Sequence, residues 1–143
     1  MKLKALDQRQ AGILLPLFSL PGKHGIGDLG KEAYEFVDLS AQAGFSIWQI
    51  LPLNPSSSGN SPYTPLFIFA GDEIYISLEL LKDWHLLDEV PNYLQDLKRV
   101  DYKRVRLFKN RYLRKAYQVF LKDKELKKEY RTFVKGTFWL KKY

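Results

Sequence analysis

The residues best suited to binding a ligand lie in one loop-forming stretch, GNSPYTPL (59–66). Glycine and proline restrict the backbone to turn geometries, which explains Gly59, Pro62 and Pro65 but not the tyrosine among them. Tyr63 can offer a ring face to the apolar C–H surface of a sugar and a hydroxyl to its polar edge. The alternative is a tyrosine that packs the loop against the protein, and spacing alone does not decide between the two.

The motifs that could indicate a catalytic site are weak. The stretch GKHGIGDLG (22–30) matches neither the dinucleotide fingerprint nor the Walker A spacing, so it does not predict nucleotide binding. His24 lacks a neighbouring carboxylate or nucleophile, and we expect a solvent-facing loop histidine rather than a catalytic base. The serines around Tyr63 lie outside G-x-S-x-G, and the carboxylate pairs 72–73 and 88–89 are adjacent residues whose side chains diverge. We therefore assign no catalytic residue.

The composition of the 143-residue chain predicts no metal, cofactor or disulfide. Cysteine is absent, and the two histidines, His24 and His85, are too far apart to suggest a paired ligand motif. The apolar run 13–20 is interrupted by Pro16 and Ser19, which makes a poor signal peptide. No segment approaches the roughly 20 apolar residues that cross a bilayer. We expect a soluble cytoplasmic protein with no membrane partner.

The N-terminal half has the pattern of a βαβ unit. Apolar residues predict a strand at 12–17, and helical spacing predicts a helix over 31–44, with Asp28 as its N-cap and Gly44 in the left-handed position at its end. A second strand is predicted at 46–53. Strand, helix and strand within so short a stretch indicate a parallel pair.

The second predicted strand leads into the loop that carries Tyr63. Its nearly continuous apolar character predicts burial on both faces, with Trp48 in the core. In α/β folds, loops after the carboxyl ends of such strands carry the binding chemistry. Further along, residues 72–81 alternate in polarity and predict a short strand or extended segment.

The C-terminal third predicts two basic helices. The first places Phe108, Tyr112, Ala116 and Phe120 on one face. The second, over 121–134, should turn inward Leu126, Tyr130 and either Phe133 or Val134. Residues 98–143 carry 17 basic against 4 acidic residues, whereas residues 1–97 carry 6 against 12. Such a block can be a nucleic-acid footprint or, as we favour, the solvated face of a helical subdomain.

Several stretches together resemble the opening of the 4-alpha-glucanotransferases, the amylomaltase or disproportionating-enzyme family (glycoside hydrolase family 77). Four of them occur in the family's order: AGILLPLFSLPGKHGIGDLGKEAYEFVDLSAQAG, WQILPLNP, GNSPY and FAGDEIYISLELL. The later stretches RVDYKRV and LRKAYQVF resemble the helical region that the family inserts after its first barrel strands, and FWLKKY resembles the W-L-x-x-Y that begins a later helix. The resemblance covers essentially the whole chain.

The resemblance implies an α/β fold: the N-terminal part of a (β/α)8 TIM barrel plus part of an inserted α-helical subdomain. Residues 1–81 would supply the first two strands, the crossover helix and the substrate loop, and residues 82–143 an incomplete, basic helical subdomain. A complete barrel needs roughly 250 residues, so we expect this chain to be an N-terminal fragment.

The resemblance also implies an activity, the transfer of α-1,4-glucan segments to glucose or glucan acceptors by a retaining double displacement. The family's aspartate nucleophile, glutamate acid/base and second aspartate would follow Tyr143, so this chain alone should be inactive. Ser61 and Tyr63 would line the donor subsites. The expected partners are maltooligosaccharides or α-1,4-glucans, and a separately encoded C-terminal portion.

Two alternatives remain. The chain could be a non-catalytic glucan-binding or complementing fragment, which would bind glucan without turnover. Less favoured is a nucleic-acid-binding protein that uses the basic block, because the helical region carries no known recognition motif; salt-dependent oligonucleotide binding would support it. We expect no nucleic-acid partner.

Overall fold

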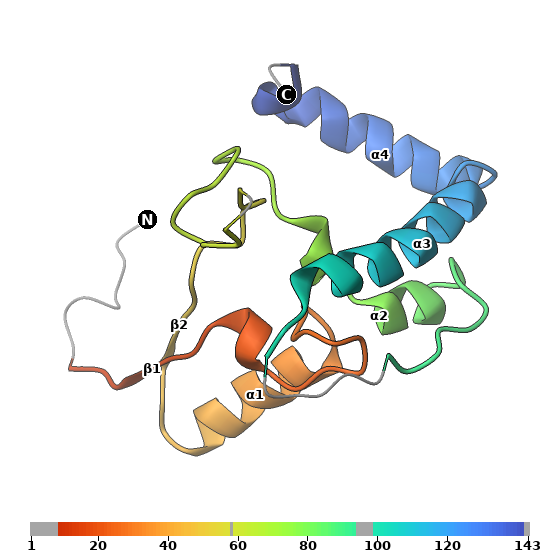
Figure 1. The fold of residues 1–143 in the computed structure, drawn as a ribbon. Coiled ribbons are helices and arrows are strands. Elements are labelled where there is room, and N and C mark those ends of the chain that lie inside the picture. Colours follow the sequence, from red (N-terminus) through yellow and green to blue (C-terminus); the bar gives the residue numbers. More distant parts are fainter. Residues whose placement is uncertain (1–8, 58, 94–98, 142–143) are drawn as a thin grey trace.

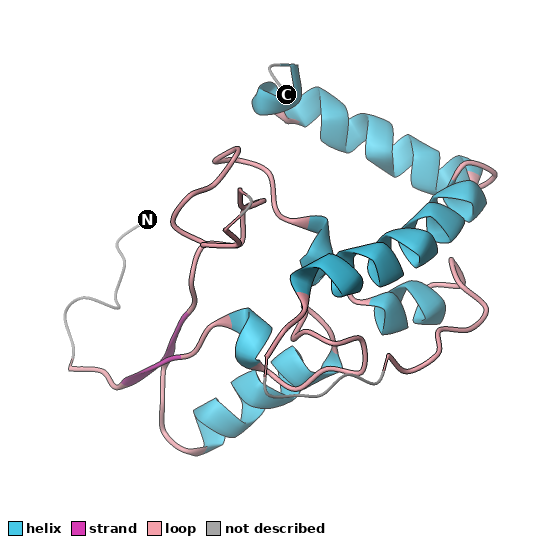
Figure 2. Ribbon diagram, in the orientation of Figure 1, coloured by secondary structure: helices cyan, strands magenta, loops and turns pink. Residues whose placement is uncertain are grey.

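The computed structural model describes residues 9–57, 59–93 and 99–141. Figure 1 and Figure 2 show two short strands and four α-helices among them: β1 (Gly12–Leu14), α1 (Lys31–Gln42), β2 (Ile47–Gln49), α2 (Leu78–Asp83), α3 (Tyr102–Phe120) and α4 (Lys124–Gly136). Three short 3-10 helices complete the described elements: η2 (Leu17–Ser19), η3 (Glu73–Tyr75) and η4 (Phe138–Lys141). The chain is therefore a mixed α/β structure.

The βαβ unit is confirmed. β1 and β2 pair in parallel, with Gly12 opposite Ile47 and Leu14 opposite Gln49. β1 is shorter than predicted because Pro16 has no N–H to continue the ladder, so the N–H of Leu15 makes the last bond, to the carbonyl of Gln49 at 3.1 Å.

Trp48 joins α1 to the sheet. Its indole Nε1 donates to the carbonyl of Leu15 at 2.8 Å, and its ring packs edge-on against Phe36 with centroids 4.9 Å apart. The tryptophan is half-buried against the larger core cluster, as predicted for a core position.

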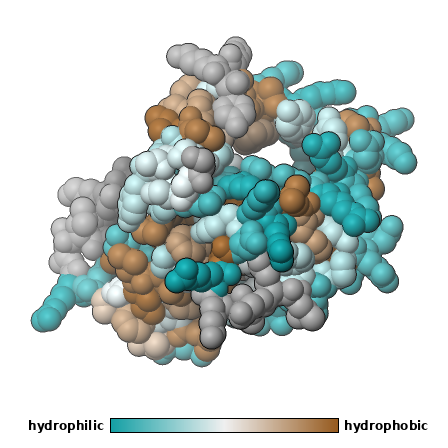
Figure 3. Space-filling view, in the orientation of Figure 1, coloured by the Kyte–Doolittle hydropathy of each residue, from teal (hydrophilic) through white to brown (hydrophobic). Residues whose placement is uncertain are grey.

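The predicted burial of the second strand on both faces is not found. Ile47 is 47% exposed and Leu14 on β1 is 59% exposed. Figure 3 shows hydrophobic surface gathered at the lower left, where the strands and α1 lie. The reason is that, among the described residues, the sheet has only two strands and a helix on one side.

The two ends of α1 differ in how well they were predicted. Gly44 has φ +86°, the left-handed conformation expected after the helix. The N-cap is Gly30 rather than Asp28, and Gly30 makes no side-chain cap bond. Asp28 is instead buried, and its carboxylate accepts a hydrogen bond from Lys109 of α3.

The short strand or extended segment predicted at 72–81 is wrong, because local hydrogen bonds favour helical turns there. The Asp72 carboxylate accepts from the N–H of Ile74 at 3.0 Å and begins η3. The Ser77 hydroxyl accepts from the N–H of Leu80 at 3.4 Å and caps α2. Such side-chain bonds to the backbone compete with the hydrogen bonds of an extended ladder. The alternating apolar residues therefore lie in and around the helical turns η3 and α2.

The two basic helices are confirmed, but the second buries its apolar face only in part. In α3, Tyr112 and Ala116 are buried as predicted. In α4, Leu126 and Val134 are partly buried, whereas Tyr130 is 53% and Phe133 56% exposed, and none of its residues is fully buried. α4 leaves the end of α3 and lies apart from α1 and α2, which explains the exposure (Figure 1).

The interior consists of two clusters. The larger is built from the 17–26 segment, α1, η3 and the start of α3, and contains Leu17, Leu20, Ile26, Ala33, Ile74, Tyr75 and Val105. The smaller lies between α2 and α3 and contains Leu78, Leu87, Tyr112 and Ala116. No helix in the described part of the chain is long and apolar enough to cross a membrane.

Candidate functional site

The loop between β2 and η3 is closed at its base. The N–H of Asp72 donates to the carbonyl of Leu53 at 2.7 Å, which joins the two ends of residues 54–71. The Asn54 side-chain amide donates to the carbonyls of Ile68 and Ala70 at 3.0 and 2.9 Å. An amide that binds backbone on the opposite limb holds the loop as a compact unit, which we call the 54–71 loop.

Backbone hydrogen bonds pair the two limbs of the 54–71 loop below its tip. The N–H of Leu66 donates to the carbonyl of Pro55 at 2.8 Å, and that of Ser57 to the carbonyl of Thr64 at 3.2 Å. Asn60 has φ 52°, a left-handed conformation that asparagine tolerates and that reverses the chain. The described residues of the tip are therefore carried on a paired stem.

The structure brings the two predicted site residues, Ser61 and Tyr63, together on this tip. The Ser61 hydroxyl accepts from the N–H of Tyr63 at 3.4 Å, and Ser61 is partly buried. Tyr63 is 70% exposed, which does not fit a tyrosine that packs the loop down. An exposed ring beside a hydroxyl can stack on an apolar surface and bond to a polar edge.

The base of the 54–71 loop carries an ion pair with α3. Arg106 donates from Nη1 to Oδ1 of Asp72 at 2.7 Å and from Nη2 to Oδ2 at 2.5 Å. Nη1 also lies 3.4 Å from Oε1 of Glu73. Both members of this carboxylate pair therefore bind an arginine, and the hydrogen bonds to Asp72 raise the pKa of the Arg106 guanidinium.

A second ion pair is buried beneath the first. Lys109 Nζ lies 2.7 Å from Oδ2 of Asp28 and 2.7 Å from the carbonyl oxygen of Ile74, and the lysine is 1% exposed. Burial lowers the pKa of Lys109 and raises the pKa of Asp28, and the attraction between the two charges opposes both shifts. This pair fastens the 22–30 stretch and η3 to α3.

Sequence reasoning missed the role of Lys109, although a signal was present. Val105, Lys109, Tyr112 and Ala116 recur at helical spacing and form the buried face of α3. A lysine inside an apolar stripe has to find a carboxylate or leave the interior, because an unpaired buried ammonium is costly. The partner itself, 81 residues away, could not be read from the chain.

The prediction for His24 is wrong, because the side chain is buried. It is 2% exposed, stacks on Phe108 with ring centroids 5.9 Å apart, and has Nε2 3.7 Å from Oε1 of Glu79. Within the described residues, Nε2 has no hydrogen-bond partner. Burial, then the charge of Lys109, lowers the pKa of His24 to about 4 although Glu79 acts in the opposite direction, so the ring is neutral at pH 7.

This low pKa predicts a loss of stability in acid. Between pH 6.5 and about 4 the unfolded chain binds a proton at His24 and the folded chain does not. The free energy of unfolding should therefore fall by roughly 3 kcal/mol as the pH is lowered across that range. Urea denaturation at a series of pH values measures it.

Two variants isolate the histidine. His24→Phe retains an aromatic ring beside Phe108 and should remove this part of the pH dependence. His85→Asn changes an exposed histidine at φ 59°, a conformation that asparagine accepts, and should retain it. An unchanged pH slope in His24→Phe would contradict the assignment.

The groups that the 54–71 loop presents are suited to binding a ligand. In the part of the chain that the structure describes, no group of three or more histidine, aspartate or glutamate side chains is placed to hold a metal ion. The described carboxylates closest to the 54–71 loop, Asp72 and Glu73, are bound by Arg106. What the loop offers is an exposed aromatic ring and hydroxyls on a braced turn.

Comparison with known proteins provides relatives for this chain. A family model described as 4-alpha-glucanotransferase, glycoside hydrolase 77, matches residues 15–143. A 4-alpha-glucanotransferase of Aquifex aeolicus is 43% identical over an alignment 142 residues long, and the alignment covers 94% of this chain and 28% of the relative. One of Synechocystis is 42% identical over an alignment 126 residues long, which covers 85% of this chain and 25% of the relative.

A solved structure is similar as well. Amylomaltase from Streptococcus agalactiae, in complex with acarbose, matches 92% of this chain with a TM-score of 0.85 and 34% sequence identity. The match covers 28% of the amylomaltase chain. This chain thus spans about a quarter of the length of these relatives.

Proposed function

The chain belongs to the 4-alpha-glucanotransferase family, glycoside hydrolase family 77, and we propose that it supplies part of the donor-glucan site of such an enzyme. The reaction is the transfer of α-1,4-glucan segments to glucose or glucan acceptors, with retention at the anomeric carbon. Ser61 and Tyr63 contact the donor sugar. We expect the catalytic carboxylates to belong to the part of the relatives that this chain does not cover.

The observation that carries the proposal is the exposed Tyr63 on a braced turn. Its side chain is 70% exposed, yet its backbone is held by the Ser61 hydroxyl and by the paired stem of the 54–71 loop. Because the backbone that carries the ring is already held, less conformational freedom is lost when a sugar stacks on the ring. The related amylomaltase was solved with acarbose, which supports an oligosaccharide as the ligand.

In the proposed architecture, β1, α1 and β2 form the first two strands and the crossover helix of a (β/α)8 barrel. Residues 1–81 belong to this barrel portion with its substrate loop, and residues 82–143 to the inserted helical subdomain. Exposure of Leu14 and Ile47 supports this, because a barrel would cover the sheet with further strands and helices.

The proposed partners are maltooligosaccharides or α-1,4-glucans. A cytoplasmic location agrees with the absence of cysteine. The proposal includes no nucleic-acid or membrane partner, and it takes the basic block of residues 98–143 as a solvated helical face. A separately encoded C-terminal portion stays a prediction that the comparisons do not support.

The test uses a full-length protein, made by joining this chain to the C-terminal three quarters of the Aquifex aeolicus relative. In that protein, Tyr63→Ala should lower kcat/KM for maltotriose disproportionation about tenfold, because it removes a stacking contact worth about 1.4 kcal/mol. Glucose release measures the transfer. Tyr63→Phe, which keeps the ring, should lose less.

Tyr34→Ala is the matched control, because Tyr34 is 63% exposed on α1. It should leave kcat/KM for maltotriose within about twofold of the unsubstituted protein. Equal kinetics for Tyr63→Ala and Tyr34→Ala would remove Tyr63 from the donor site. Glucan binding without any transfer in the unsubstituted full-length protein would favour a non-catalytic binding module instead.

A further inference from the structure

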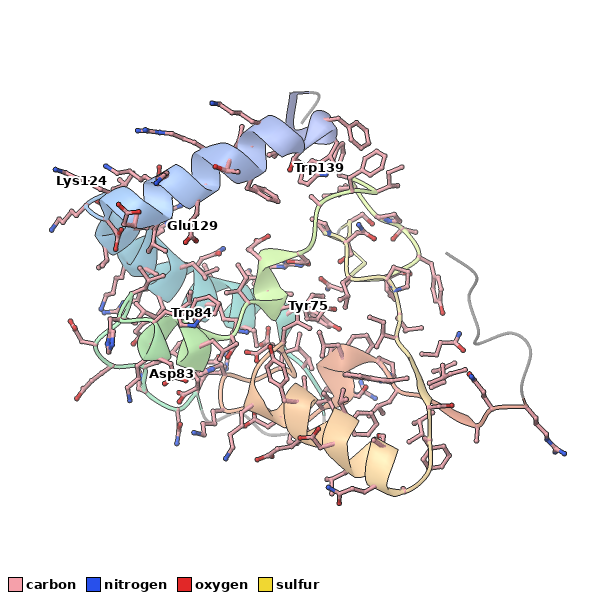
Figure 4. All side chains as sticks on the ribbon, turned by 180° about the vertical axis from the view of Figure 1, so that it is seen from behind. Tyr75, Asp83, Trp84, Lys124, Glu129 and Trp139 are labelled. Atoms are coloured by element: carbon pink, nitrogen blue, oxygen red, sulfur yellow. The ribbon has the colours of Figure 1, made fainter. Side chains whose placement is uncertain are left out.

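α3 and η4 hold the 54–71 loop at two separate places, α3 through Asp72 at the loop's base and η4 through aromatic contacts. At the loop's base, Arg106 of α3 binds Asp72. On its outer limb, Phe69 packs edge-on against Phe138 with ring centroids 5.6 Å apart, and Phe67 lies 6.0 Å from Trp139. Figure 4 shows Trp139 at the end of α4, beside the limb of the loop that leads to η3 and Tyr75. The loop is thus held by the helical region as well as by its own backbone bonds.

Asp72 is the residue through which the contact at the base reaches the loop. Its N–H binds the carbonyl of Leu53, which closes the loop, and its Oδ1 accepts from the N–H of Ile74. Its side chain is 3% exposed, against 27% for the side chain of Arg106. Asp72 therefore connects the closing point of the loop, through its backbone N–H, with η3 and α3, through its carboxylate, so a shift of α3 would displace the base of the loop.

The arginine provides a directional constraint that a simple positive charge would not. Two guanidinium nitrogens meet the two carboxylate oxygens, at 2.7 and 2.5 Å, which fixes the carboxylate plane as well as its distance. Lysine offers a single ammonium and would leave that plane free to turn. Partial burial of the pair also protects it from screening by salt.

From this geometry we propose that Arg106 is a positioning residue for the donor-sugar loop. It acts through Asp72 to hold the tip that carries Ser61 and Tyr63, so the helical insertion sets the donor site without touching sugar. This inference rests on the proposed function, since it takes the 54–71 loop to bind the donor. Its expected signature is a weaker donor affinity with unchanged chemistry, because loop contacts made equally in the ground and transition states affect KM rather than kcat.

The test compares Arg106→Gln with Arg104→Gln in the full-length protein described above. Arg104 is the control because it carries the same charge on the same helix but is exposed and, among the described residues, forms its ion pair with Asp101 three positions earlier. With maltotriose as varied donor and labelled glucose as acceptor, Arg106→Gln should raise the donor KM about fivefold and leave kcat and the acceptor KM within about twofold. Arg106→Lys should recover part of the loss.

Hydrogen exchange provides a readout that does not depend on turnover. In Arg106→Gln, amides of residues 54–72 should exchange faster while those of α1 keep their rate, whereas Arg104→Gln should change neither. If Arg106→Gln fails to fold, as judged by circular dichroism, the same measurements on Arg106→Lys decide the question.

The outcomes separate the two proposals. An unsubstituted full-length protein that transfers no glucan overturns the proposed function, and loop exchange then still tests the role of Arg106 in holding the loop. If transfer occurs but Arg106→Gln matches Arg104→Gln in donor KM and in loop exchange, the positioning role is wrong. A uniform loss of kcat together with faster exchange throughout the protein would also overturn it, since that is the signature of general destabilisation.

Discussion

Replacing Lys109 with methionine is expected to lower the free energy of unfolding by about 3–5 kcal/mol, because it leaves the Asp28 carboxylate buried without its partner. Nζ of Lys109 makes two contacts of 2.7 Å, one to Asp28 and one to the carbonyl of Ile74, and both would be lost. Methionine fills a similar volume, so the loss measures the missing charge rather than a cavity. Urea denaturation followed by tryptophan fluorescence gives the value.

Two further variants separate burial from charge. Lys103→Met removes an exposed lysine from the same helix and should change the stability by no more than about 0.5 kcal/mol. Adding Asp28→Asn to Lys109→Met removes the uncompensated charge and should recover at least about 1 kcal/mol. A Lys109→Met protein as stable as the Lys103→Met protein would show that the ion pair does not hold the interior together.

Gly27→Ala is expected to be comparably severe, with a loss of at least about 3 kcal/mol, because the backbone around Gly27 leaves no room for a methyl group. A Cβ there would lie 2.2 Å from the carbonyl oxygen of Leu17 and 2.8 Å from that of Leu20. Both neighbours are backbone atoms of buried core residues, so no side chain can rotate away to relieve the clash. The segment around η2 would have to shift.

Gly71→Ala is the matched control, since a Cβ at Gly71 meets nothing within 4 Å. It should leave the stability unchanged or raise it by about 0.4–1 kcal/mol through the unfolded chain. The thermal unfolding midpoints of the two variants provide the comparison. Equal midpoints would mean that the 17–27 segment is loose enough to absorb a methyl group, and that its close packing is not needed.

Local pattern was sufficient for the order and type of most elements. Hydrophobic spacing predicted α1, α3 and α4 and the parallel pairing of β1 with β2. It worked because helical and extended periodicities depend on neighbouring residues alone. It failed at residues 72–81, where Asp72 and Ser77 hydrogen bond to nearby N–H groups and shift the backbone from extended to helical.

Contacts between distant parts of the chain could not be predicted from local sequence pattern. His24 looked like a loop residue in contact with solvent and is buried against Phe108, 84 positions along the chain. Asp28 looked like a helix cap and is the partner of Lys109. In both cases a helix far along the chain covers a glycine-rich stretch whose own composition suggests exposure.

The sequence by itself determined the βαβ order, the two basic helices and, through the resemblance of several loops, the family to which the chain belongs. It also singled out Ser61 and Tyr63. Only the tertiary structure decided that the Tyr63 ring stands in solvent, that Arg106 braces the loop's base, and that Lys109 lies inside. The reason is that turns and helices follow from short-range sterics and spacing, whereas the pairing of buried charges depends on which segments meet, and that is a property of the folded chain.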